Sequence, residues 1–333
     1  MAKNTPTIYD VAARAGVSIS TASRVLNDPN KVSEKTRTAV ISVIDQLGFV
    51  PKADARARAL SKSRRVDVIT PFFTAPSFVQ RLRGIAAALT PLNYELVIHT
   101  VESVSRLKNH LTALPMRADL DGLIIIALNI DETNAARLVH GRLETVLIEC
   151  RHEELSSVEI DDVTGGRMVA DYLAAKGHRR FAFIGDSFFP DYGVHPISNR
   201  LVGFRQALAE RGIDLPDERV HLVPVDVETT RQHVHRWLEM AEPPTAVFAA
   251  TDLQAIGVLQ AARDCGLRMP DDLAVVGFDD LDISNYLGLT TVCQHLDESG
   301  KVAVEMLLFR LSNSTRSIQH VELPLEIMER DTA

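Results

Sequence analysis

The sequence contains little cysteine, few aromatic residues and no long apolar run. Among 333 residues there are three cysteines and one tryptophan, and aromatic residues make up 5% of the chain. Three cysteines far apart in the sequence form no disulfide framework and no paired metal site, so we expect free thiols in a reducing compartment. No stretch approaches the roughly 18 apolar residues of a membrane span, and the first residues carry no apolar signal core. These absences predict a soluble cytoplasmic protein that does not contact a membrane.

Charge is divided unevenly along the chain. The formal net charge is −8, yet residues 1–65 carry 12 Lys and Arg against 5 Asp and Glu. A small basic module therefore precedes a large acidic body, and such a module favours a polyanionic partner. The length and the 46% hydrophobic content are sufficient for two or three domains with their own cores.

Start and stop signals predict three helices in the basic module. Thr7 and Asp10 form a capping-box pattern, and Ser18 precedes a second helical stretch after a glycine turn. A third helix is expected to begin after Ser33 and to end at Gly48. Two short helices joined by a tight turn are typical of a helix-turn-helix, whose second helix enters the major groove of double-stranded DNA.

The second of these helices carries side chains suited to DNA. Ile19 and Ser20 open it, where an apolar group can meet a thymine methyl and a hydroxyl can bind a base edge. Arg24, one turn further on, can bind a guanine or a phosphate. A plain helical hairpin with solvated hydroxyls is the alternative. The candidate DNA contacts of this module are Thr7, Tyr9, Ser18, Ile19, Ser20, Thr21, Ser23, Arg24, Asn27 and Ser33.

From Val66 onward, β-rich runs alternate with helical stretches. This alternation predicts parallel sheets covered by helices on both faces, and the length of the region favours two similar α/β lobes over one large core. Ligands of such sheets bind at the carboxyl ends of the strands. The expected strands are 66–70, 95–100, 122–127, 145–149, 180–185, 246–250 and 273–278.

Short motifs continue along the whole chain after the helix-turn-helix stretch 7–27. They include 32–37, Leu47-Gly48-Phe49, Pro51, Asp121-Gly122, Gly177-His178, Thr251-Asp252 and Gly277-Phe278-Asp279-Asp280. Together these segments resemble the lactose repressor family of bacterial transcription regulators. The resemblance implies a DNA-binding transcription regulator, a repressor, whose operator affinity is controlled by a small effector.

The resemblance also implies the fold class and the domain organisation. A small all-α helix-turn-helix headpiece is expected at 1–50, a hinge helix or linker at 51–65, and a type I periplasmic-binding-protein-like body with parallel sheets at 66–333. Two α/β lobes of this body would close around the effector. Lobe 1 would comprise about 66–159 and 293–318, and lobe 2 about 160–292 and 319–333. No heptad extension follows the final strand, so a homodimer is favoured over the tetramer of some relatives.

Effector contacts are carried over from the family position by position. Arg200 resembles the effector-binding arginine, Asp279 the carboxylate that grips ligand hydroxyls, and Thr251 stands where several relatives carry asparagine. A guanidinium and a carboxylate can share adjacent hydroxyls, which favours a carbohydrate over a purine. The pocket-wall positions after the first strand are Phe73, Ser77 and Phe78, and Ser77 offers no ring for stacking. The alternatives are a surface ion pair for Arg200, a turn cap for Asp279 and core packing for the aromatic residues.

The linker departs from the family pattern. Residues 52–60 are alanine-rich and basic, with too little apolar surface to fold without a partner. In relatives, a leucine seven residues after the proline wedges into the minor groove; here Arg58 holds that position after Pro51, and Leu60 follows two residues later. Two residues rotate a helical side chain by about 200°, so both cannot face the groove together. Leu60 as the wedge is the interpretation we favour, and Arg58 in a narrow minor groove is the alternative.

Other patterns indicate no further chemistry. His233 and His235 are the one close histidine pair and would lie on different faces of a helix, so neither a metal site nor a cofactor is expected. Gly165-Gly166 lacks the spacing of a phosphate loop and favours helix packing. No catalytic residue is marked by a motif, so no enzyme is expected. The rival classes are a cytoplasmic α/β enzyme acting on a sugar or nucleotide, and a sugar-binding receptor.

Overall fold

The computed structural model describes residues 6–27, 31–49, 64–117, 119–188, 190–313 and 317–333. The linker candidates Arg58 and Leu60 lie outside these residues. The chain divides into two compact units. Unit 1 comprises Met1–Phe73, Ile85–Ser157 and Lys301–His320, and unit 2 comprises Thr74–Gly84, Val158–Gly300 and Val321–Ala333.

Unit 1 begins with three helices, α1 (Ile8–Ala15), α2 (Ile19–Asn27) and α3 (Glu34–Leu47). The predicted capping box is present: the Thr7 N–H donates to the Asp10 carboxylate at 2.7 Å, and the Asp10 N–H donates to the Thr7 hydroxyl. Gly16 and Gly48 end α1 and α3 with positive φ angles, a conformation that glycine adopts without steric cost. The helices enclose a core of Val11, Ala12, Ala22, Val25, Val40, Val43, Ile44 and Phe49.

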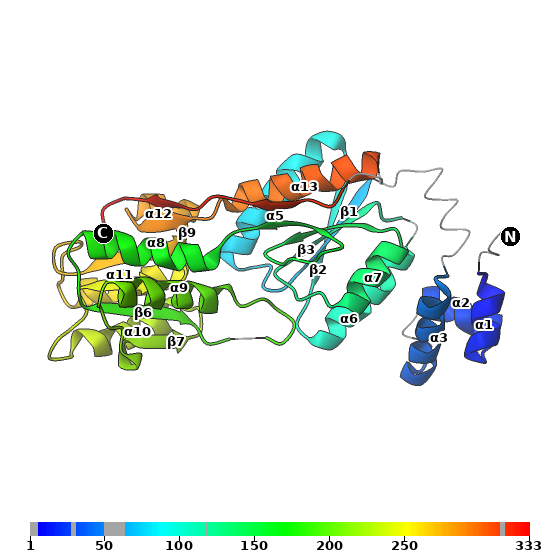
Figure 1. Cartoon of the computed structure of the whole chain (residues 1–333), viewed down its shortest axis with the longest axis horizontal. Coiled ribbons are helices and arrows are strands. Elements are labelled where there is room, and N and C mark those ends of the chain that lie inside the picture. The colour runs from blue at the N-terminus through cyan, green and yellow to red at the C-terminus, as the bar shows by residue number, and fades with distance from the viewer. Residues whose placement is uncertain (1–5, 28–30, 50–63, 118, 189, 314–316) are drawn as a thin grey trace. The chain divides into compact units, whose positions relative to one another are not determined.

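The first sheet has the strand order β11-β5-β4-β3-β1-β2. Its strands are β1 (Arg65–Thr70), β2 (Glu95–Thr100), β3 (Gly122–Ile126), β4 (Glu144–Ile148), β5 (Ser156–Glu159) and β11 (His320–Glu322). The pairs β1–β2, β1–β3 and β3–β4 are parallel. The helices α6 (Val104–Ala113) and α7 (Glu132–His140) lie on one side of the strands, and α5 (Pro76–Leu89) and α13 (Leu296–Ser312) lie on the other (Figure 1).

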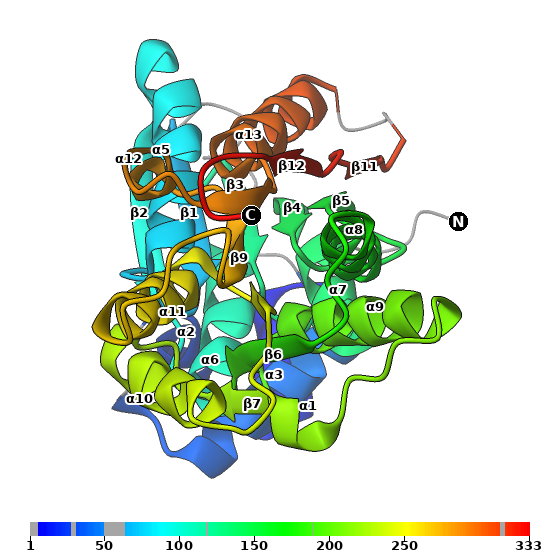
Figure 2. The same ribbon diagram turned by 90° about the vertical axis from the view of Figure 1, so that its left-hand side faces the viewer.

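The second sheet, in unit 2, has the order β12-β10-β9-β8-β6-β7. Its strands are β6 (Phe181–Asp186), β7 (Val220–Val223), β8 (Ala246–Ala249), β9 (Ala274–Asp279), β10 (Thr290–Cys293) and β12 (Glu326–Met328). The pairs are parallel except β10–β12. Two buried clusters lie on its two faces, one with α8 (Asp162–Ala175) and α9 (Pro196–Glu210), the other with α10 (Val227–Leu238) and α11 (Asp252–Asp264) (Figure 2). A short helix, α12 (Asp282–Tyr286), follows β9.

The helices α8 and α9 approach each other at two glycines. A Cβ added to Gly166 would lie 1.9 Å from the carbonyl oxygen of Arg200, and one added to Gly203 would lie 1.9 Å from that of Val163. No side chain fits at these distances, so both positions require glycine. The prediction that Gly165-Gly166 serves helix packing is confirmed, since the Gly165 Cβ position is also filled, by Phe278 and Leu325.

The predicted elements are present with small shifts at their ends. All seven expected strands occur, for example 145–149 as β4 (Glu144–Ile148) and 273–278 as β9 (Ala274–Asp279). Two α/β lobes with largely parallel sheets follow the helical headpiece, as expected. Within the described residues, no helix is both long enough and apolar enough to cross a membrane.

Candidate DNA-binding surface and effector site

The first turn of α2 presents an open surface in the headpiece. Ile19 is 45% exposed although it is apolar, and Ser20 and Arg24 are also exposed. The Ser18 hydroxyl accepts from the Thr21 N–H at 3.1 Å and lies 2.8 Å from the Ser20 hydroxyl, so the start of the helix is held in place. The opposite face of α2 is buried through Ala22 and Val25. An exposed, rigid first turn is what base recognition by a helix requires.

The other candidate DNA contacts lie on the helices of the headpiece or at their N-caps. Thr7 and Ser33 are the N-caps of α1 and α3, so their hydroxyls stand beside helix N-termini, which attract phosphate. Tyr9 is 66% exposed. Thr21 and Ser23 are half-buried, and Asn27 is the last residue of α2.

A buried arginine, Arg200, contacts the ends of two strands of unit 2. Arg200, on α9, donates from Nε to the Asp162 carboxylate at 2.8 Å and from a terminal nitrogen to the Ala250 carbonyl oxygen at 2.6 Å. Its guanidinium lies 3.6 Å from the centroid of the Phe278 ring. The side chain is 3% exposed, so the surface ion pair considered from the sequence is wrong for Arg200. A guanidinium stacked and bonded in this way is fixed in orientation before any ligand arrives.

The second predicted effector contact, Asp279, ends β9 and is also buried. It accepts a hydrogen bond from the Gln294 amide, and Arg81 donates to the same amide group from the other side at 2.8 Å. Burial, only partly offset by the charge of Arg200, raises the pKa of Asp279 to about 8. A raised pKa favours the protonated carboxyl, which can donate a hydrogen bond to a hydroxyl-bearing ligand and accept one from it.

The remaining effector candidates differ in their surroundings. Thr251 is the N-cap of α11 and accepts from the Gln254 N–H at 3.2 Å. Phe73, in a turn after β1, is 44% exposed, whereas Ser77 and Phe78 are half-buried in the first turn of α5. Arg200 and Asp279 are both buried in unit 2, and the charge of Arg200 acts on Asp279. We call these two residues and their hydrogen-bonded neighbours Asp162, Gln294 and Arg81 the effector network. Thr251 is occupied as a helix cap.

Three residues of this network were missed by the sequence analysis: Asp162, Gln294 and Arg81. Asp162 opens α8 directly after β5, and an acidic residue at a strand-to-helix junction was the available signal. Arg81 and Gln294 are 213 residues apart, and nothing in the local sequence of either indicates the contact.

The raised pKa of Asp279 predicts a pH dependence of stability. Because the pKa in the folded state, about 8, lies above the pKa of 3.8 of an ordinary aspartate, the folded chain binds more protons than the unfolded chain between these limits. The contribution of Asp279 to the free energy of unfolding is fully present below pH 4 and is lost as the pH rises to 8, by up to about 1.4 kcal/mol per pH unit. We expect Asp279→Asn to reduce this slope in urea titrations between pH 5 and 8. Equal slopes for the variant and the unaltered protein would contradict the assignment.

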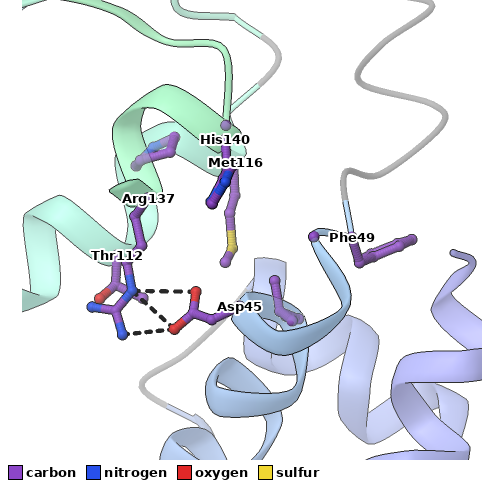
Figure 3. A pocket seen from close by; sticks show the side chains of 10 residues that line it. Asp45, Phe49, Thr112, Met116, Arg137 and His140 are labelled. Carbon is purple, nitrogen blue, oxygen red and sulfur yellow. Dashed lines mark hydrogen bonds and ion pairs between the residues drawn. The ribbon is translucent and has the colours of Figure 1, made fainter. Parts of the chain in front are cut away.

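Residues at the end of α3 and on α7 line a hollow in unit 1 (Figure 3). Arg137 donates to the Asp45 carboxylate at 2.7 Å, and both side chains are partly exposed. An ion pair of this exposure contributes at most about 1 kcal/mol. The candidate DNA contacts are not among the residues that line the hollow, which are Ile44, Asp45, Gly48, Phe49, Thr112, Pro115, Met116, Arg137, His140 and Gly141.

Two regions of the chain, one in the headpiece and one in the body, match known protein families. The family description "Bacterial regulatory proteins, lacI family" matches residues 7–52, and "Periplasmic binding protein-like domain" matches residues 170–333. Catabolite control protein A of Priestia megaterium is 31% identical over 333 residues, which cover 98% of each chain. The chain belongs to the lacI family of bacterial regulatory proteins.

Two solved structures of lacI-family proteins resemble the whole chain. The complex of the transcriptional regulator CelR with cellobiose has a TM-score of 0.70 and 28% identity, covering 98% of this chain and all of that one. The lac repressor dimer bound to operator and the anti-inducer ONPF has a TM-score of 0.70 and 26% identity, covering 99% of both chains. The predicted fold class and the function as a DNA-binding transcription regulator are confirmed, and the enzyme alternative is dropped.

Proposed function

We propose that this lacI-family regulator is a repressor that binds its operator as a homodimer in the cytoplasm, where the DNA lies. The headpiece at 1–50 would read the major groove with the exposed first turn of α2, through Ile19, Ser20 and Arg24. The linker at 51–65 would lie in the minor groove. Leu60 as the wedge, with Arg58 as the alternative, stays a prediction from the sequence.

The effector that we propose is a carbohydrate bound at the carboxyl ends of the strands of unit 2. The observation that carries this is the effector network, in which Arg200 and Asp279 are buried and Arg200 is bonded to Asp162. Arg200 is paired with Asp162, and the raised pKa of Asp279 favours its neutral form, so these groups can bind neutral hydroxyls without a new uncompensated charge. A cellobiose complex among the similar solved structures supports a sugar. Phe73, Ser77, Phe78 and Thr251 are proposed as further contacts.

A calorimetric titration tests the effector class. Ribose, cellobiose and a wider set of sugars, together with purine bases and nucleosides, are added to the full chain. We expect heat from at least one sugar and at least a tenfold weaker affinity in Arg200→Lys, because a lysine cannot reproduce the fork of the guanidinium. Lys176→Ala is the matched control, since Lys176 pairs with Glu329 away from the network. Tight binding of a purine with no response to any sugar would contradict the proposal.

A further inference from the structure

A cysteine, a histidine and an aspartate meet on the surface of unit 2, outside the effector network. Cys265 follows the last residue of α11 and is exposed. Its sulfur lies 3.4 Å from Nδ1 of His235, on the neighbouring helix α10. Nε2 of the same ring lies 3.2 Å from the Asp264 carboxylate, so one imidazole joins the thiol to the acid.

The aspartate determines which ring nitrogen carries the proton. A carboxylate accepts hydrogen bonds, so the neutral imidazole carries its proton on Nε2, and its lone pair on Nδ1 faces the thiol of Cys265. Arg231 bonds to the same Asp264 carboxylate, and together with His235 it lowers the pKa of Asp264. The acid therefore remains ionised and holds the ring in this tautomer. This is the order of groups in which a histidine activates a thiol.

The other two cysteines are less exposed. Cys293 is half-buried, its sulfur is 3.7 Å from Nδ1 of His295, and burial raises the pKa of its thiol to about 11. Nε2 of His295 has no hydrogen-bond partner within the described part of the chain, so no acid orients that ring. Cys150 is also half-buried. Cys265 alone among the three combines exposure with an oriented base.

We propose that Cys265 is a modification site at which the protein forms mixed disulfides with small disulfide molecules. His235 accepts the thiol proton at Nδ1 while the Cys265 sulfur attacks one sulfur of the small disulfide. The new sulfur–sulfur bond forms, the old one breaks, and the leaving thiolate takes up the proton that His235 accepted. The small disulfide is the oxidant, and one small thiol is released for each protein modified.

The test measures the rate and the site of the exchange on the full chain. The rate of reaction with the uncharged probe 4,4′-dithiodipyridine is measured from the thiol that it releases. After reaction with oxidised glutathione, the intact mass of the protein shows whether the mixed disulfide has formed, and peptide mapping identifies the modified cysteine. We expect Cys265 to react first, and Cys265→Ser to abolish the fast phase. General-base catalysis typically contributes about 100-fold or more, so we expect His235→Gln to slow the fast phase at least tenfold. Asp264→Asn should slow it less, because the base itself remains.

His295→Gln is the matched control, because that histidine stands beside Cys293, and it should leave the fast phase unchanged. Unfolding midpoints of all variants show whether the fold is retained. The proposal is overturned if His235→Gln reacts within twofold of the unaltered protein, or if Cys150 or Cys293 reacts before Cys265.

Discussion

Removing residues 1–63 is expected to abolish specific DNA binding while leaving a folded protein that still binds its effector. The removed segment holds most of the basic module and all candidate DNA contacts, and the remaining chain is acidic, so its affinity for a polyanion falls. The cut lies after residue 63 because Arg64 donates its N–H to Asp121 and β1 begins at Arg65. The lost Arg137–Asp45 ion pair is too exposed for its absence to unfold unit 1.

A gel shift with genomic fragments and a calorimetric titration with the effector measure the two activities of the shortened chain.

The substitution Arg24→Ala in the full chain tests the DNA-binding role of the headpiece at a single residue. It should weaken operator binding by about 1–3 kcal/mol and lower the salt dependence, whereas Arg14→Ala on α1 should have a smaller effect. Specific retardation of DNA by the shortened chain would disprove the division into a DNA-binding headpiece and an effector-binding body.

Gly203→Ala is expected to destabilise the protein by about 3 kcal/mol, the upper end of the usual cost of an inserted methyl group. The new methyl group would lie 1.9 Å from the Val163 carbonyl oxygen, which is backbone of α8 and cannot rotate away. Relief requires α8 and α9 to separate. Because Arg200 lies one turn before Gly203 on α9 and its partner Asp162 opens α8, the same movement should also weaken effector binding.

Gly212→Ala provides the control for this substitution. Gly212 has a positive φ of 68° and no atom within 4 Å of its Cβ position, so alanine there costs about 1 kcal/mol from backbone strain alone. Urea unfolding of both variants separates the clash from the strain. Equal midpoints for Gly203→Ala and Gly212→Ala would show that α8 and α9 can move apart at little cost.

The headpiece could be predicted nearly residue by residue. Its start and stop signals are local: the capping box of Thr7 and Asp10, the cap at Ser33 and the left-handed Gly48 each act within a few residues. Strands with continuous apolar runs, such as β3 and β9, were equally visible. The strands β5, β7, β10, β11 and β12 were not predicted, because each has only three or four residues, too few to show a pattern, and becomes a strand only through pairing with its neighbours.

The effector site was predictable only in part. Resemblance to the family gave Arg200 and Asp279, whereas Asp162, Arg81 and Gln294 were found only in the structure. The hydrogen-bond partners of Arg200 are 38 and 50 residues away in the sequence, and Gln294 joins Asp279 to an arginine on α5. Sequence periodicity carries no information over such separations.

By itself the sequence determined the helical headpiece, the alternation of strands and helices, and the separation of a basic module from an acidic body. Those properties depend on propensities, caps and charges that act within a turn or a strand. Only the tertiary structure decided that Arg200 is buried and stacked on Phe278, that Asp279 has a raised pKa, and that Cys265 faces an oriented histidine. Desolvation and side-chain orientation arise from residues brought together by packing, so they exist only once the chain has folded.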